Sequence, residues 1–349
     1  RRQRQMCIRD SDNATGLSHL VVQDLNGNSA RISARAYVLA AGAIENARLM
    51  LASRNVETNG IGNARDQVGR YFMEHPHGRL GLVRSDQAFA LWTAFKKRFP
   101  RGTVPLMPVL RPSPEFQARE GILNTALTFK LQRDPATGVA LNKRAYLALK
   151  HQLSPTKANR ALWHNYNRAR RLFQRYRTPL VHLANRAGKR QVYAMVRAEQ
   201  APNPDSRVVL SGARDALGTP RADLRWLTNS QDKHTLRVMA RALDEALNRA
   251  GQGGFEAESW LEETSPAWPV DPTVGNHPIG GYHHMGTTRM SDSPDSGVVD
   301  KNCQVFGYSN LFVAGSSVFS TAGWANPTLT IVALAHRLGR RLRTNLICQ

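Results

Sequence analysis

The sequence predicts a mixed α/β protein that includes a separate α+β lobe. Two stretches, residues 37–51 and 310–343, each read as a short apolar strand, a tight turn of small residues and a helix, the pattern of a doubly wound parallel sheet. Between them, residues 80–270 alternate strand-like segments with two helical regions, which favours an antiparallel sheet accompanied by helices. With 349 residues, 41% apolar residues and 26 glycines, the chain is long enough for two domains.

The first strand–turn–helix unit comes after a predicted hairpin. The segment HLVVQDL leads into a turn at Asn26-Gly27, and the following strand continues to the apolar run 37–41. Gly42 closes this strand, and a helix begins at once in IENARLMLAS. Ala41 and Gly42 therefore stand where a doubly wound sheet presents its strand ends to a nucleotide.

The middle of the chain holds a second clear helix. Residues 230–251 begin with a Ser N-cap and end at a glycine, and their apolar residues recur at three- and four-residue steps: Leu236, Met239, Leu243 and Leu247. The glycine-punctuated segment 60–78 before it reads as a connection. His75 and His77 flank a proline there, so they cannot share a helical face as metal ligands, and we expect a structural or substrate-side role and no metal site.

The last unit places polar groups near a helix start. The strand 310–314 ends in Gly315-Ser316, and Asn326-Pro327 opens a helix that runs to about residue 343. Asn is preferred at the N-cap and Pro at the first helical position. We expect a buried helix start, whose N–H groups suit a ligand with negative charge, and a packed side formed by Leu329, Val332, Leu338 and Leu342.

The charge is strongly positive and unevenly placed. The formal net charge is +22, and residues 135–198 contain fourteen Lys or Arg and no Asp or Glu. Such a stretch is either a solvated face or a surface for an acidic partner or an anionic membrane. No nucleic-acid-binding motif accompanies it, so we predict no nucleic-acid partner.

The beginning of the chain is unusual. Residues 6–11, MCIRDS, resemble the translation of a transposase end used in preparing sequencing libraries, so we expect residues 1–11 to be a non-native leader. No run of eighteen apolar residues is present, and the three cysteines have neither metal-ligand nor disulfide-framework spacing.

Four motifs together point to a family. HxxGT at 283–287, GVVD at 297–300, NLFVAGSS at 310–317 and NPTLT at 326–330 resemble the carboxy-terminal part of a glucose–methanol–choline (GMC) oxidoreductase. Residues 34–51 and 199–211 are similar to further segments of that family, in the family's order. The resemblance covers nearly the whole chain from about residue 17.

The resemblance implies FAD as cofactor and an alcohol or sugar as substrate, with hydride passing to flavin N5. It implies that His283 is the general base and that Asn326 hydrogen-bonds the substrate oxygen. An imidazole titrates near pH ~6.5 and accepts a proton at neutral pH, whereas an amide cannot act as the base. The alternative is that His283 and His284 are two loop histidines bonded to backbone. The residues implied to bind the cofactor are Ala41, Gly42, Gly315, Ser316, Asn326, Pro327 and Thr328.

The resemblance also implies a domain plan. Residues 12–79 would be a partial FAD-binding domain, 80–280 the substrate-binding domain, and 281–349 the return to the FAD-binding domain. The family's G-x-G-x-x-G loop is absent from this sequence. We therefore expect this chain to be a fragment that holds FAD poorly. The alternatives are a sterol-type oxidase of the same superfamily and, in a different class, a basic docking fragment whose 135–198 stretch binds an electron-acceptor protein or a membrane.

Overall fold

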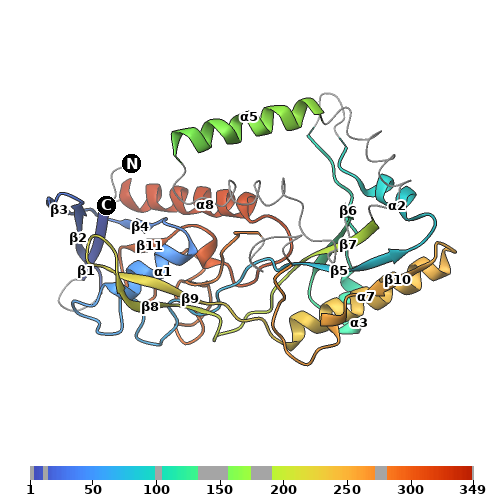
Figure 1. Ribbon diagram of the computed structural model, residues 1–349. Coiled ribbons are helices and arrows are strands. Elements are labelled where there is room, and N and C mark those ends of the chain that lie inside the picture. Colours follow the sequence, from blue (N-terminus) through green and yellow to red (C-terminus); the bar gives the residue numbers. More distant parts are fainter. Residues whose placement is uncertain are drawn as a thin grey trace. The chain divides into compact units, whose positions relative to one another are not determined.

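The computed structural model describes residues 4–10, 15–98, 104–132, 156–173, 191–271 and 281–347 (Figure 1). The chain divides into two compact units. Unit 1 consists of residues 1–75, 199–232 and 281–349, and unit 2 of residues 76–198 and 233–280. Both units mix helices with strands, so the predicted α/β class with an α+β lobe is confirmed.

The centre of unit 1 is a parallel pair of strands. β4 (Tyr37–Leu39) pairs with β11 (Leu311–Val313), and α1 (Ala43–Ala52) follows β4 directly. All three residues of β11 are buried, as are the ends of β4. One face of α1 is buried as well, through Ala43, Asn46, Ala47, Leu49, Met50 and Leu51. The apolar runs in the sequence thus form the partial doubly wound sheet that they predict.

A three-stranded antiparallel sheet also belongs to unit 1. Its order is β1 (Arg4–Asp10), β2 (Leu17–Asp24) and β3 (Ser29–Ile32), with the β2–β3 turn at Gly27. The prediction of one strand running on to residue 41 was wrong, because β3 pairs with β2 whereas β4 pairs with β11. The fold prediction also left out β1. The non-native origin of residues 1–11 stays a prediction.

The hairpin of β8 (Arg207–Arg214) and β9 (Pro220–Arg225) lies in unit 1, although the domain plan places it at 80–280. Arg48 of α1 explains this placement. Its Nε donates to the Pro220 carbonyl at 2.7 Å, and its guanidinium forms an ion pair with Asp215. Segment 199–232 is therefore tied to α1 of the predicted cofactor domain.

Unit 2 is built on an antiparallel sheet with the strand order β10-β5-β7-β6. The strands are β10 (Gly254–Ala257), β5 (His77–Arg84), β7 (Gln191–Ala198) and β6 (Thr125–Gln132). The accompanying helices are α2 (Ala88–Phe95), α3 (Pro114–Glu120), α5 (Lys157–Phe173) and the short 3-10 helix η2 (Ser259–Leu261). Helix α5 lies in the basic stretch, and most of the remainder of residues 135–190 is outside the described residues.

Helix α7 (Ser230–Arg249) has the predicted buried side, formed by Leu236, Met239, Leu243 and Leu247. It is tied to β10 by the Asp244 carboxylate, which accepts the Phe255 N–H at 2.7 Å. The predicted Ser cap was wrong by one residue. Asn229 Oδ1 accepts the Asp232 N–H at 3.1 Å, and Asp232 Oδ2 accepts the Asn229 N–H at 2.8 Å, which is a reciprocal cap.

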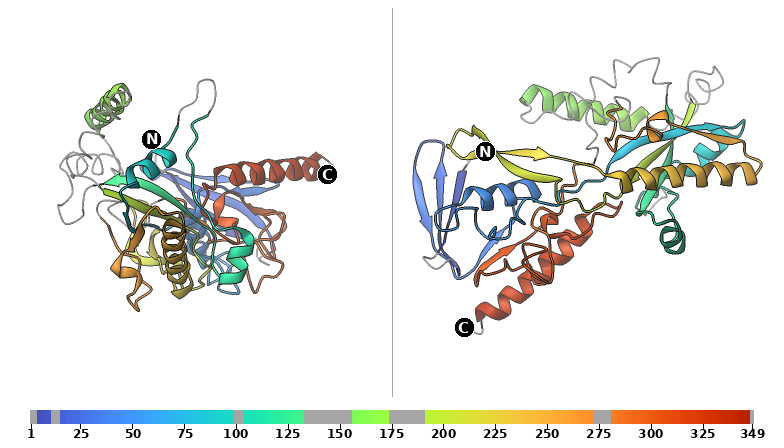
Figure 2. Two further views of the ribbon diagram at one scale, coloured as in Figure 1. Left: turned by 90° about the vertical axis from the view of Figure 1, so that its right-hand side faces the viewer. Right: turned by 90° about the horizontal axis from the view of Figure 1, so that it is seen from below.

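Helix α8 (Thr328–Ile347) ends the described chain (Figure 2). Leu338 is buried on it, but Leu329 is 82% and Val332 48% exposed. The expectation of a buried first turn with both residues on a packed side was therefore wrong, because no described residue covers that face. Within the described ranges, no helix combines the length and the apolar character needed to cross a bilayer.

Candidate functional site

The carboxyl ends of β4 and β11 meet at one edge because the two strands are parallel and in register. The chain continues from β4 through Ala41 and Gly42, and from β11 through Gly315 and Ser316. The Ala314 N–H donates to the Leu39 carbonyl at 2.8 Å, which extends the pairing to the last residues. We call Ala41, Gly42, Gly315 and Ser316 the strand-end site. The structure thus brings together the four strand-end residues predicted to bind the cofactor.

Asn46 fixes the two halves of the strand-end site. Its buried amide accepts the Ala41 N–H at 2.8 Å and donates to Ser317 Oγ at 2.9 Å. It also donates to the Ala314 carbonyl at 3.4 Å. The sequence analysis missed this residue. The sequence did offer a signal for it, a polar side chain on the inner face of the predicted helix 44–53. Because buried amides are normally hydrogen-bonded, such a side chain indicates a partner inside the protein.

The two glycines of the strand-end site leave open space above the backbone. Gly42 has a φ of 89° and Gly315 a φ of 111°, values that side-chain-bearing residues rarely adopt. A Cβ at either position would have no heavy atom within 4 Å. Packing against the described residues therefore does not require glycine at either position. Their conformation and open surroundings suit the close approach of a ligand to the backbone.

The HxxGT segment runs beside the strand-end site. The N–H groups of Gly286 and Thr288 donate to the carbonyls of Ser316 and Ser317, at 3.2 and 2.9 Å. Thr287 Oγ1 donates to the Ala43 carbonyl at 2.6 Å, at the start of α1. The hydroxyl of Ser316 is itself used to hold this segment, since it donates to the His284 carbonyl at 2.6 Å. The motif's threonine and glycine thus lock the histidine segment against both strand ends.

Gly286 lies against the backbone of Tyr71, which leaves no room for a side chain at position 286. Its φ is 88°, and a Cβ there would lie 2.1 Å from the Tyr71 carbonyl oxygen. The glycine of the HxxGT motif is therefore required for the close approach of residues 71 and 286. This approach belongs to a short antiparallel bridge between Met73 and Met285, whose two backbone hydrogen bonds are both 3.0 Å.

The two adjacent histidines have different surroundings. The His284 ring lies 5.4 Å from the Phe72 ring and 6.5 Å from the Tyr282 ring, between centroids. Burial, with a smaller contribution from the neighbouring His283, lowers the pKa of His284. His284 is therefore a neutral packing residue at pH 7. The His283 ring instead faces His75 edge-on, with centroids 5.2 Å apart.

Tyr282, directly before His283, has a φ of 55°. A non-glycine residue in this left-handed region costs of order 1–3 kcal/mol and is found most often at functional sites. This turn sets the direction in which the chain enters the histidine pair.

The remaining predicted site residues stand at the start of α8. Asn326 and Thr328 are exposed, and Pro327 is buried. The Ile331 N–H donates to the Pro327 carbonyl at 2.9 Å and α8 begins at Thr328, one residue after the predicted first helical position. These three residues belong to the same unit as His283 and the strand-end site.

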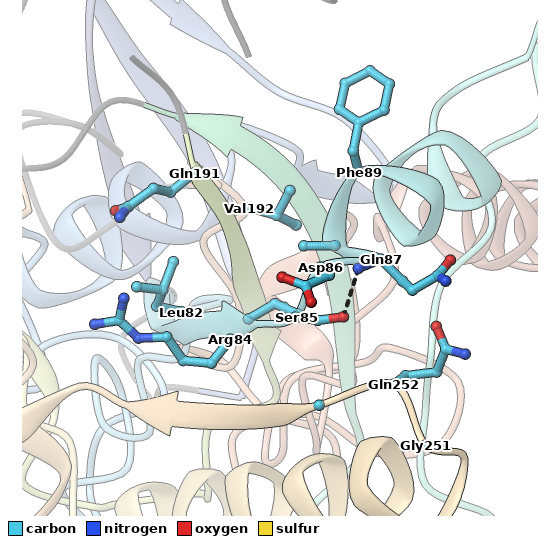
Figure 3. A pocket seen from close by; sticks show the side chains of 13 residues that line it. Leu82, Arg84, Ser85, Asp86, Gln87, Phe89, Gln191, Val192, Gly251 and Gln252 are labelled. Atoms are coloured by element: carbon cyan, nitrogen blue, oxygen red, sulfur yellow. Dashed lines mark hydrogen bonds between the residues drawn. The ribbon is translucent and has the colours of Figure 1, made fainter. Parts of the chain in front are cut away.

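A cavity of about 620 Å³ lies elsewhere, in unit 2 (Figure 3). Its lining includes Arg84, Asp86, Gln87, Gln191 and Gln252, around the end of β5 and the start of α2. It contains no residue of the strand-end site or of the HxxGT segment. Among the described residues, no group of three or more His, Cys, Asp or Glu side chains is arranged to hold a metal ion.

Comparisons with known proteins find relatives of this chain. Residues 202–335 match the family model described as "GMC oxidoreductase". The fructose dehydrogenase large subunit of Gluconobacter japonicus is 26% identical over 341 residues, 97% of this chain and 52% of that protein. The 6'''-hydroxyparomomycin C oxidase of Streptomyces lividus is 27% identical over 321 residues, 92% of this chain and 47% of that protein. The chain therefore spans about half the length of these curated relatives.

A solved structure of formate oxidase matches with a TM-score of 0.49 at 15% identity, covering 98% of this chain and 60% of that chain. The family match contains the β8–β9 hairpin, the HxxGT segment, β11 and the start of α8. The HxxGT segment, β11 and the start of α8 belong to the candidate site, whereas β4 and α1, which complete it, precede the matched residues. Residues 202–335 of this chain thus match the GMC oxidoreductase family.

Proposed function

We propose that the protein to which this chain belongs is an FAD-dependent oxidoreductase that oxidises a CH–OH group of a small alcohol or sugar. The observation that carries the proposal is the locking of the HxxGT segment to the paired strand ends, through the backbone of residues 316–317 and the Ala43 carbonyl. The names of the relatives support the substrate class, since one is a fructose dehydrogenase subunit and another a 6'''-hydroxyparomomycin C oxidase.

The residues present fit FAD. Gly42 and Gly315 carry open backbone next to the N-terminus of α1, where N–H groups and the helix dipole favour phosphate oxygens. The exposed start of α8, at Asn326 and Thr328, offers a second set of N–H groups to a ring that gains negative charge. The residues that would hold the cofactor are therefore Ala41, Gly42, Gly315, Ser316, Asn326, Pro327 and Thr328.

When bound, FAD supplies the hydride acceptor at its N5 atom. His283 would accept the hydroxyl proton of the substrate as the C–H bond breaks, because an imidazole titrates close enough to pH 7 to act as a general base. Asn326 would donate an amide hydrogen bond to the same oxygen, orienting it toward the imidazole. His284 is held in packing contact with Phe72, which leaves His283 as the base of the pair.

The test is flavin retention followed by reduction. The parent protein, to which this chain belongs, is mixed with FAD and desalted, and its visible absorption is recorded before and after adding fructose or another polyol. We expect the parent protein to retain flavin and to lose its absorption with substrate. His283→Ala is expected to keep the flavin, but substrate should bleach its absorption at a rate lower by a factor of about 10² or more. His284→Gln, the matched control, is expected to bleach.

A parent protein without flavin after desalting would refute the FAD assignment. Bleaching in His283→Ala at the wild-type rate would refute the role of His283 alone. The sterol-type alternative is addressed by the same assay with a sterol as substrate, and bleaching by the sterol in preference to a polyol would replace the sugar assignment.

The basic stretch 135–198 supports a second, compatible role as a docking surface for an electron-acceptor protein or an anionic membrane. Within it, α5 contains five Arg or Lys and no acidic residue. Attraction between exposed charges is screened beyond about 10 Å at 0.1 M salt. A pull-down with anionic vesicles or an acidic protein should therefore weaken as salt rises. Absence of binding at low salt would exclude this role.

A further inference from the structure

A buried pair of titratable residues, Glu74 and His75, adjoins His283. Both side chains are completely buried. The antiparallel bridge between Met73 and Met285 determines the register of the two segments. In an antiparallel pair, the residue two positions after one bridge partner lies opposite the residue two positions before the other, on the same face. His75, two residues after Met73, therefore lies across from His283, two residues before Met285. The ring contact, at 5.2 Å and 72°, agrees with this register.

Glu74 approaches the same imidazole from the side of Gly281. A Cβ at Gly281 would lie 2.9 Å from Glu74 Oε2 and 3.1 Å from His283 Nδ1. The two atoms therefore face the same small space and are at most about 6 Å apart. Glu74 Oε2 also accepts the His75 N–H at 3.0 Å, and the Glu74 N–H donates to Gln200 Oε1 at 3.0 Å. The His75 backbone thus holds one carboxylate oxygen of Glu74, and the Gln200 side chain holds the Glu74 backbone.

We propose that Glu74 and His75 are positioning residues for His283. The His75 ring sets the plane of the His283 imidazole, and the Glu74 carboxylate stabilises the imidazolium that forms when His283 accepts a proton. This inference rests on the proposed role of His283 as the base.

Histidine NMR on the whole chain tests this without flavin or turnover. The imidazole signals of the 11 histidines are followed against pH, and the His283 signal is identified by its loss in His283→Gln. Four titratable residues surround His283 in the described ranges. Glu74 and His75 lie across the Met73–Met285 bridge, and Tyr282 and His284 are the neighbours of His283 in the chain. In the wild-type chain we expect His283 to be half-protonated at a higher pH than His284.

Two substitutions are expected to act in opposite directions. Glu74→Gln keeps the acceptor for the His75 N–H but removes the charge, and should lower the pH of half-protonation of His283 by about 0.5 to 2 units, the range for a unit charge about 6 Å away. His75→Gln removes a second imidazole whose protonation would oppose that of His283 across the ring contact, and should raise the pH of half-protonation of His283. Glu256→Gln, an exposed ion-pair partner of Arg84 in unit 2, is the control and should change nothing.

No change in Glu74→Gln, or the same direction of change in both variants, would overturn the proposal. If either variant fails to fold, the wild-type comparison still decides, because a His283 that protonates no more readily than His284 contradicts it. A protein that shows the expected shifts but never binds flavin would refute the proposed function and leave the positioning pair intact.

Discussion

Replacing Gly286 with alanine is expected to lower the free energy of unfolding by about 2–5 kcal/mol. Two effects combine in this value. Holding a residue with a Cβ at a φ of 88° costs about 1–2 kcal/mol. The new methyl group would also lie 2.1 Å from the Tyr71 carbonyl oxygen and 2.8 Å from Met73 Cε, and the backbone shift that relieves such overpacking costs about 1–3 kcal/mol.

Gly27 provides a control that separates the two effects. Its φ is 87°, but a Cβ there would meet no heavy atom within 4 Å. Gly27→Ala should therefore cost only the conformational part, about 1–2 kcal/mol. Equilibrium unfolding in urea, followed by tryptophan fluorescence, measures both variants. If Gly286→Ala and Gly27→Ala destabilise equally, the close approach of residues 71 and 286 does not constrain the HxxGT segment.

Three further predictions concern stability. Asn46→Ala removes the hydrogen bonds that join the strand ends and should cost about 2–3 kcal/mol by the same urea assay, and an unchanged midpoint would contradict the role of Asn46. Burial, which outweighs two backbone hydrogen bonds, raises the pKa of Asp232 to about 6, so the folded state binds the proton more tightly than the unfolded state. Stability should fall as pH rises from about 4 to 6, by up to about 3 kcal/mol, and Asp232→Asn should remove this part of the pH dependence. Leu338→Ala should cost about 2–5 kcal/mol while Leu329→Ala changes stability by less than about 0.5 kcal/mol, and equal thermal shifts would show that the first turn of α8 is covered.

The local signals in the sequence were sufficient for the main elements. The apolar run before Gly42, the run before Gly315 and the spacing of Leu236, Met239, Leu243 and Leu247 gave strands and a helix close to their observed bounds. The Asn-Pro signal located the start of α8 to within one residue. These features depend on periodicity and backbone chemistry, which are local properties.

Features that depend on distant partners could not be predicted in the same way. The break between β3 and β4 arises because each pairs with a different strand. Segment 199–232 joins unit 1 through Arg48, a contact that no local pattern encodes. His75 was expected to be structural or substrate-side, but its position opposite His283 depends on the Met73–Met285 bridge, and residues more than 200 positions apart carry no visible register.

The pairing of β4 with β11 also determines when the site forms during synthesis. The hydrogen bonds from Asn46 to Ala314 and Ser317 join residues 268 and 271 positions apart. Closing a flexible loop of that length costs about 5 kcal/mol in chain entropy, in addition to a constant term. A compactly folded unit 2 shortens the effective loop, so we expect unit 2 to fold first. The ribosome must synthesise residues 40–310 before the partner of β4 emerges, and until then the apolar strand remains exposed to chaperones and to aggregation.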